Sequence, residues 1–125
     1  MKKYVICIPA SDDFALATAV LIYSIKKNLR VVDDCDFVVP YNNLNEDSMS
    51  LIRKAHSETM FKPPKNSDFY KHIPRTIYGV GNFDVYLSFE TFSQIGYERS
   101  IYLDADMLCT GDFSDIIEDD KQIIW

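Results

Sequence analysis

Two aspartates stand one residue apart near the C-terminal end of the sequence, directly after a short apolar run. The run at residues 101–103 (I-Y-L) predicts a buried strand, and Asp104-Ala105-Asp106 follows at its carboxyl end. Because side chains alternate along a strand, Asp104 and Asp106 should point the same way, with Ala105 opposite. Carboxylates held close together repel one another, so the pair needs a shared proton or a cation. A hard divalent cation with oxygen ligands meets that need most simply.

A second polar segment follows the first apolar run of the chain. Residues 4–9 (Y-V-I-C-I-P) predict a strand that is buried on both faces. Ser11 comes next and is a plausible N-cap for a helix expected over residues 12–29. Asp12 and Asp13 then occupy the first turn, where the positive end of the helix dipole favours acidic side chains.

The rest of the sequence predicts the elements that would position these two segments. Further strands are expected at 37–40, 68–73 and 122–125, and a short one at 107–109. Helices are expected at 46–57 with Asn45 as N-cap, at 83–95 with Gly96 at the C′ position, and at 112–118. Turns or loops are expected at 33–36, 59–66 and 79–82.

This alternation of strands and helices favours an α/β fold, with a Rossmann-like, mainly parallel sheet flanked by helices. In such sheets, ligands bind beyond the carboxyl ends of the strands, near a switch in strand order. If the strands at 4–9 and 101–103 are neighbours, the two polar segments meet at one crevice.

Composition limits the classes of partner. The 125 residues suffice for a single domain over residues 1–125, and the 47% of apolar residues can form a core. The net charge of −6 argues against nucleic acid or an anionic membrane as the main partner. A phosphate-bearing ligand would therefore need a metal ion to offset local negative charge.

The cysteines and the apolar runs indicate a cytoplasmic protein without a membrane span. The sequence has three cysteines, Cys7, Cys35 and Cys109. Their odd number and the lack of a C-x-x-C motif favour reduced thiols. The apolar run at residues 4–10 lacks the cleavage site of a signal peptide. No stretch approaches the roughly 18 apolar residues of a membrane-spanning helix.

The sequence around the two aspartates resembles a known family. Residues 102–116, Y-L-D-A-D-M-L-C-T-G-D-F-S-D-I, are similar to the D-x-D region of family 8 glycosyltransferases, the glycogenin-like group with the GT-A fold. Residues 7–28, C-I-P-A-S-D-D-F-A-L-A-T-A-V-L-I-Y-S-I-K-K-N, resemble the opening strand and helix of that family. Residues 96–99 fit its turn into the D-x-D strand.

The resemblance implies a metal-dependent nucleotide-sugar site. Asp106 would ligate Mn²⁺ or Mg²⁺, and Asp104 would share the metal and reach the ribose of a UDP-sugar. The metal would bridge the diphosphate and stabilise charge on the leaving UDP. The family transfers a hexose to an acceptor hydroxyl with retention of anomeric configuration, and no catalytic residue is assigned in this sequence.

The resemblance also implies a pocket for the nucleoside. Ala10 and Ser11 would line the base and the ribose, with Ala105 contributing from the D-x-D motif. Phe14 occupies the position where the family often has an aromatic beside the uracil ring. Core packing is the alternative for Phe14, and helix capping alone could explain Ser11.

Three features of the family are missing from this sequence. No basic residue lies in 83–95, where the family carries one that faces the phosphates; Arg75 and Arg99 are the nearest. The third metal ligand of the family is a downstream histidine, whereas His56 and His72 both lie upstream. The sequence ends about twenty residues beyond D-x-D.

We therefore expect the nucleotide-sugar-binding half of the fold, without the acceptor-binding half. Such a half would leave apolar surface for a homo-oligomer to cover. A non-catalytic nucleotide-sugar or metal-binding module, or a remnant of a transferase, is the alternative function.

Two other classes fit less well. Phosphatases of the haloacid-dehalogenase type also use D-x-D, but on the first strand and with Thr or Val where this sequence has Leu108. A phosphoacceptor receiver domain needs an aspartate at the end of its middle strand, and residues 70–73 contain none.

Overall fold

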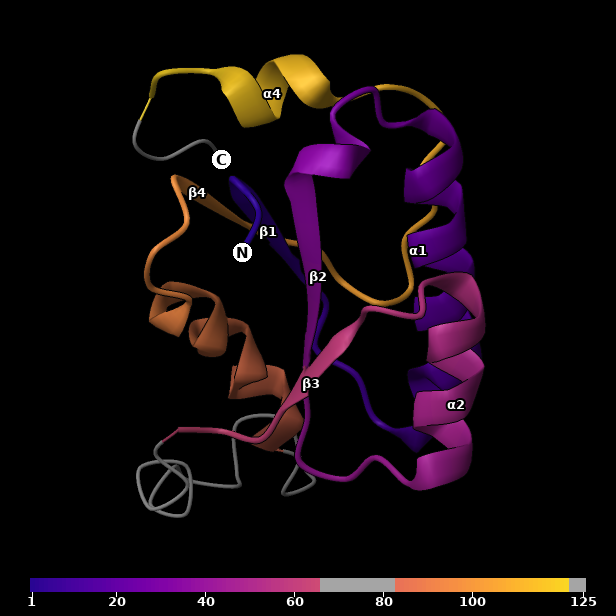
Figure 1. Ribbon diagram of the computed structural model, residues 1–125. Helices are drawn as coiled ribbons and strands as arrows, with labels where there is room; N and C mark the ends of the chain where they lie inside the picture. Colours follow the sequence, from indigo (N-terminus) through magenta and orange to yellow (C-terminus); the bar gives the residue numbers. More distant parts are fainter. Residues whose placement is uncertain (66–82, 122–125) are drawn as a thin grey trace.

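A computed structural model describes residues 1–65 and 83–121, without the side chains of 83–86 (Figure 1). Its centre is a four-stranded sheet in the order β3-β2-β1-β4, and every pairing is parallel. The strands are β1 (Tyr4–Cys7), β2 (Cys35–Pro40), β3 (Met60–Lys62) and β4 (Arg99–Tyr102). The predicted α/β class with a mainly parallel sheet is confirmed.

The two faces of the sheet are covered by different helices (Figure 1). On one face α1 (Ala15–Asn28) and α2 (Glu46–Ala55) pack against each other and against the sheet. The 3₁₀ helix η3 (Phe83–Ser93) contacts β4 and β2 and covers the other face. Short elements complete the chain: η1 (Asp12–Phe14), η2 (Val32–Asp34) and α4 (Ser114–Glu118).

Central burial explains why β1 is apolar at every position. All four of its residues are buried, and their side chains alternate between the two faces. Tyr4 and Ile6 belong to the large core beneath α1 and α2, whereas Val5 and Cys7 belong to a small cluster on the η3 face. A strand buried on both faces needs no polar alternation.

The predicted N-cap of α2 is confirmed, whereas two other predicted details differ. The Asn45 side chain accepts a hydrogen bond from the Ser48 backbone N–H at 2.8 Å and so caps α2. Gly96 has a φ of +100°, the left-handed conformation that favours glycine, but η3 already ends at Ser93, so Gly96 is not at the expected C′ position. The turn expected at 33–36 is only partly present, because η2 ends at Asp34 and β2 already begins at Cys35.

Other predictions were wrong in type or extent. The expected loop at 59–66 contains β3, because Met60 and Phe61 pair with β2 before Pro63. Residues 107–109 form no strand. Residues 83–93 form a 3₁₀ rather than an α-helix. The expected strands at 68–73 and 122–125 and the turn at 79–82 lie outside the described residues.

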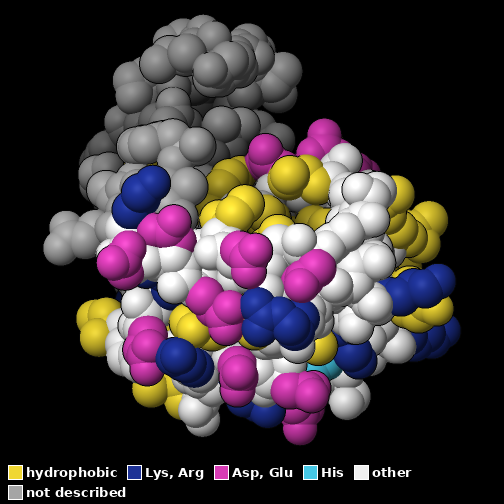
Figure 2. Space-filling model, turned by 90° about the horizontal axis from the view of Figure 1, so that it is seen from above, with side chains coloured by type: hydrophobic (Ala, Val, Ile, Leu, Met, Phe, Trp, Pro, Cys, Tyr) yellow, Lys and Arg dark blue, Asp and Glu magenta, His cyan; other side chains and the backbone are white. Residues whose placement is uncertain are grey.

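Long-range hydrogen bonds attach the segment after β4 to α1. Ser24 Oγ accepts from the Cys109 backbone N–H at 3.0 Å, and the Asn28 side-chain amide donates to the Cys109 carbonyl at 3.0 Å. At the end of α1, the Arg30 guanidinium pairs with Glu118 of α4 at 2.7 Å. Figure 2 shows this end of the molecule, where acidic and basic side chains intermingle.

Two further expectations concern the cysteines, expected to be reduced thiols, and the helices, expected not to span a membrane. Cys7, Cys35 and Cys109 are all free thiols. Burial raises the pKa of the Cys7 thiol to about 11 and that of Cys35 to about 12. Among the described helices, none combines the length and the apolar character that crossing a membrane requires.

Candidate functional site

The two polar segments follow the carboxyl ends of neighbouring strands. β1 and β4 pair in parallel, and the ladder continues as the Leu103 N–H donates to the Cys7 carbonyl at 3.0 Å. Beyond β1 the chain turns toward β2, where the Ala10 N–H donates to the Pro40 carbonyl at 3.2 Å. The condition set by the sequence, that the two strands be neighbours, is met.

This edge of the sheet is also where the strand order reverses. From β1 the chain adds β2 and then β3 on one side, and it adds β4 on the other side of β1. The carboxyl ends of β1 and β4 therefore flank the switch point at which open parallel sheets bind ligands. Residues 10–14 and 104–106 both begin at that point.

The acidic motif keeps the alternation of the strand. Ile101 and Leu103 pack against the core under α1, and Ala105, which is only 8% exposed, belongs to the same core. Asp104 and Asp106 are both exposed. Because the Ala105 methyl is buried, a contact between Ala105 and a ligand would have to come from its backbone.

Tyr102 connects β4 to the acidic motif. Its hydroxyl donates a hydrogen bond to Oδ1 of Asp104. Burial raises the pKa of this hydroxyl, and the hydrogen bond to Asp104 and the negative charges of Asp104 and Asp106 raise it further. The hydroxyl therefore stays protonated, as a donor, across the neutral pH range. Sequence reasoning missed Tyr102, although it is two residues before Asp104 on the same side of a strand.

The donor set of the motif suits a hard divalent cation. Two exposed carboxylates supply the oxygen ligands that Mg²⁺ and Mn²⁺ prefer. In the described part of the chain, no three His, Cys, Asp or Glu side chains gather closely enough to hold a metal ion. The remaining ligands of a cation here would be oxygens of a bound ligand and water, since Mg²⁺ usually keeps several waters in its coordination shell.

The segment after β1 combines a buried start with an exposed aromatic end. Ala10 is buried and Ser11 is half-buried. Ser11 precedes η1, but its side chain makes no capping hydrogen bond, so side-chain capping does not explain it. Phe14 is 46% exposed, which rules out core packing as the reason for an aromatic there. Almost half of its surface is therefore open to solvent.

Asp12 has a role that sequence reasoning missed. Its Oδ1 accepts hydrogen bonds from the Asn45 backbone N–H and the Ser48 hydroxyl, both at 2.8 Å. The carboxylate therefore joins the turn after β1 to the amino end of α2. The partners lie more than thirty residues apart in the sequence, so no local pattern could reveal them.

Arg99 and His56 do not lie at this edge. Arg99 begins β4, at the opposite end from Asp104, and donates to the Lys121 carbonyl at 2.5 Å. His56 packs against Phe37 with ring centroids 5.1 Å apart, and burial lowers its pKa. Arg75 and His72 lie outside the described residues.

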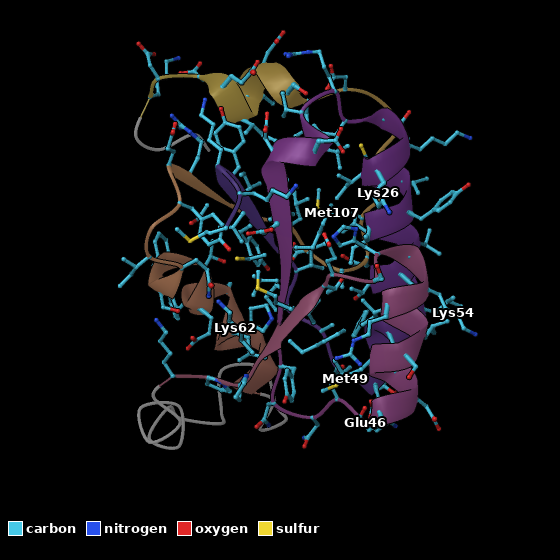
Figure 3. All side chains as sticks on the ribbon, in the orientation of Figure 1. Lys26, Glu46, Met49, Lys54, Lys62 and Met107 are labelled. Carbon is cyan, nitrogen blue, oxygen red and sulfur yellow. The ribbon has the colours of Figure 1, made fainter. Side chains whose placement is uncertain are left out.

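Lys62 is a cation that sequence reasoning passed over, because it was assigned to a loop. It ends β3 at the carboxyl edge of the sheet, and its Nζ donates to Gln94 Oε1 at 2.9 Å. Figure 3 shows Lys62 on the side of β3 that η3 covers. Its charge acts on the Cys7 thiol and partly offsets the effect of burial on the Cys7 pKa.

Taken together, these observations define an α/β domain in which a pair of exposed carboxylates follows the carboxyl edge of a parallel sheet, the edge at which such sheets bind ligands. The sequence matches the family model of glycosyl transferase family 8 over residues 5–122, and the chain belongs to that family. A search of curated proteins found no match.

Solved structures show the same fold. The galactosyltransferase LgtC, in complex with donor and acceptor sugar analogues, has a TM-score of 0.68 and 19% identity, covering 93% of this chain and 42% of LgtC. An active-site mutant of LgtC has a TM-score of 0.68 and 16% identity over the same shares. The bifunctional glycosyltransferase WbbM has a TM-score of 0.67 and 17% identity, covering 94% of this chain and 21% of WbbM.

These neighbours confirm the GT-A fold. The chain spans less than half the length of either neighbour, so it corresponds to only part of each.

Proposed function

We propose that this chain is the nucleotide-sugar-binding half of a metal-dependent family 8 glycosyltransferase, with a UDP-sugar as donor. One observation carries the proposal: in a member of this family, the D-x-D carboxylates and the turn after β1 flank the switch point of the sheet. Ligands of open α/β sheets bind at that place.

The residues of the two segments have separate roles in this proposal. Asp104 and Asp106 hold Mn²⁺ or Mg²⁺, which when bound offsets the charge that develops on the leaving diphosphate. A cation is needed to offset the charge of the diphosphate because the chain itself carries a net charge of −6. Ala10 and Ser11 line the base and ribose, and the exposed ring of Phe14 lies beside the uracil.

The reaction is transfer of a hexose to an acceptor hydroxyl with retention of configuration. The bond between the anomeric carbon and the diphosphate oxygen breaks, a bond to the acceptor oxygen forms, and UDP leaves, while the proton of the acceptor hydroxyl passes to the leaving diphosphate or to solvent. The acceptor, a carbohydrate or a protein, and the catalytic group stay unassigned. A cytoplasmic location and a homo-oligomeric state also stay predictions, and light scattering tests the latter.

A non-catalytic nucleotide-sugar or metal-binding module is the second candidate. It is favoured by the absence of a third side-chain ligand within residues 1–65 and 83–121. It is also favoured by the lack of a basic residue on η3. Both candidates bind UDP with a divalent cation, so binding and turnover must be measured separately.

Calorimetric titration with UDP, with and without Mn²⁺, tests the binding step. We expect Mn²⁺ to strengthen UDP binding in the wild type and to have no such effect in Asp106→Asn. Asp33→Asn is the matched control, because Asp33 is exposed in η2 at the opposite edge of the sheet. Binding of UDP that is indifferent to Mn²⁺, or to Asp106→Asn, would sink the proposal.

Turnover of UDP-glucose and UDP-galactose separates the two candidates. Release of UDP at a rate that Asp106→Asn abolishes indicates an enzyme. Tight, Mn²⁺-dependent binding without any UDP release indicates a binding module.

A further inference from the structure

Tyr102 stands between the sheet and the proposed cation site. It is the last residue of β4, paired with Cys7 of β1, and its side chain is 42% exposed. Its hydroxyl donates to Oδ1 of Asp104. Within residues 1–65 and 83–121, Tyr102 is the side chain that donates a hydrogen bond to a carboxylate of the motif.

This hydrogen bond restricts how Asp104 can turn. The β1–β4 ladder fixes the backbone of Tyr102, and the acceptor is only two residues further along the same chain. With Oδ1 accepting from Tyr102, Oδ2 is the less occupied oxygen and the better placed one for a ligand. An unrestrained aspartate side chain loses rotamer entropy when it ligates a metal. A hydrogen bond that already restricts the side chain lowers this entropic cost of binding.

We propose that Tyr102 is a positioning residue of the cation and nucleotide-sugar site, which fixes Asp104 with Oδ2 free to face the ligand. This inference rests on the proposed function, since it assigns a role toward that same site.

The test compares Tyr102→Phe with a matched control. Tyr97→Phe removes a hydrogen bond of the same kind, because the Tyr97 hydroxyl donates to Asp36 Oδ2 at 2.8 Å, near the start of β2. We expect Tyr102→Phe to weaken Mn²⁺ binding in the presence of UDP by about tenfold, the scale typical of groups that orient a metal ligand. Tyr97→Phe should leave Mn²⁺ affinity unchanged. Electron paramagnetic resonance of free Mn²⁺ measures the affinity directly, without turnover.

A second readout begins with the wild type and uses the same two variants to assign the signal. Because the hydroxyl is bonded to the carboxylate that takes the cation, Mn²⁺ should perturb the ultraviolet difference spectrum of a tyrosine in the wild type. The perturbation should persist in Tyr97→Phe and vanish in Tyr102→Phe.

The outcomes distinguish the two claims. If the wild type binds no Mn²⁺ with UDP, the proposed function fails and the positioning role falls with it. If the wild type binds Mn²⁺ but Tyr102→Phe binds it equally well, or no tyrosine signal accompanies binding, the positioning role alone is wrong.

Discussion

Replacing Asp12 by alanine should destabilise the whole domain, although Asp12 is exposed and lies in a short turn. The substitution removes the acceptor of two hydrogen bonds, from the Asn45 backbone N–H and the Ser48 hydroxyl. A hydrogen bond to a charged group contributes about 1.5–3 kcal/mol when buried, and a helix N-cap about 1 kcal/mol. Ser48 is buried, but Asp12 is open to solvent, so values near the lower end apply.

We therefore expect Asp12→Ala to lower the free energy of unfolding by about 2 kcal/mol, measured by urea denaturation. Asp12→Asn keeps an Oδ1 acceptor and should retain most of that stability. Asp13→Ala is the matched control, because Asp13 is the neighbouring exposed residue in η1. Equal effects of Asp12→Ala and Asp13→Ala would refute the link between the turn and α2.

Three further predictions follow from burial. Phe14→Ala should weaken UDP binding about tenfold, since stacking of a base on an aromatic contributes about 1–3 kcal/mol, while the unfolding midpoint stays near that of the wild type. The pKa of His56 is lowered in the folded state, so the free energy of unfolding should fall as the pH drops below about 6.5. His56→Gln should flatten the dependence of that free energy on pH below about 6.5. Cys109, which is half-buried, should react with a thiol reagent at pH 8 well before Cys7 and Cys35, whose raised pKa values and burial protect them.

Local signals predicted much of the fold. The apolar runs at 4–9 and 101–103 revealed β1 and β4, because strands buried in a parallel sheet need apolar residues throughout. Asn45 revealed the start of α2, because its acceptor lies only three residues from the N–H that it caps. In both cases the physical cause lies within a few residues of the signal.

Features that depend on distant partners were missed. The three residues of β3 form a strand because β2 offers an edge to pair with. No local signal shows that edge, whereas the two prolines that follow predict a loop. The role of Asp12 depends on α2, which no spacing near Asp12 encodes. The sequence did not predict the strand order, so it could not establish that β1 and β4 are neighbours.

The central claim is that residues 10–14 and 104–106 form one metal-dependent nucleotide site at the switch point of the sheet. Paramagnetic broadening of amide signals by Mn²⁺ in the presence of UDP tests it directly. We predict that both segments broaden together, while the opposite edge, marked by Asp33 and His56, keeps sharp signals. Broadening at only one segment, or at the opposite edge, would contradict the account.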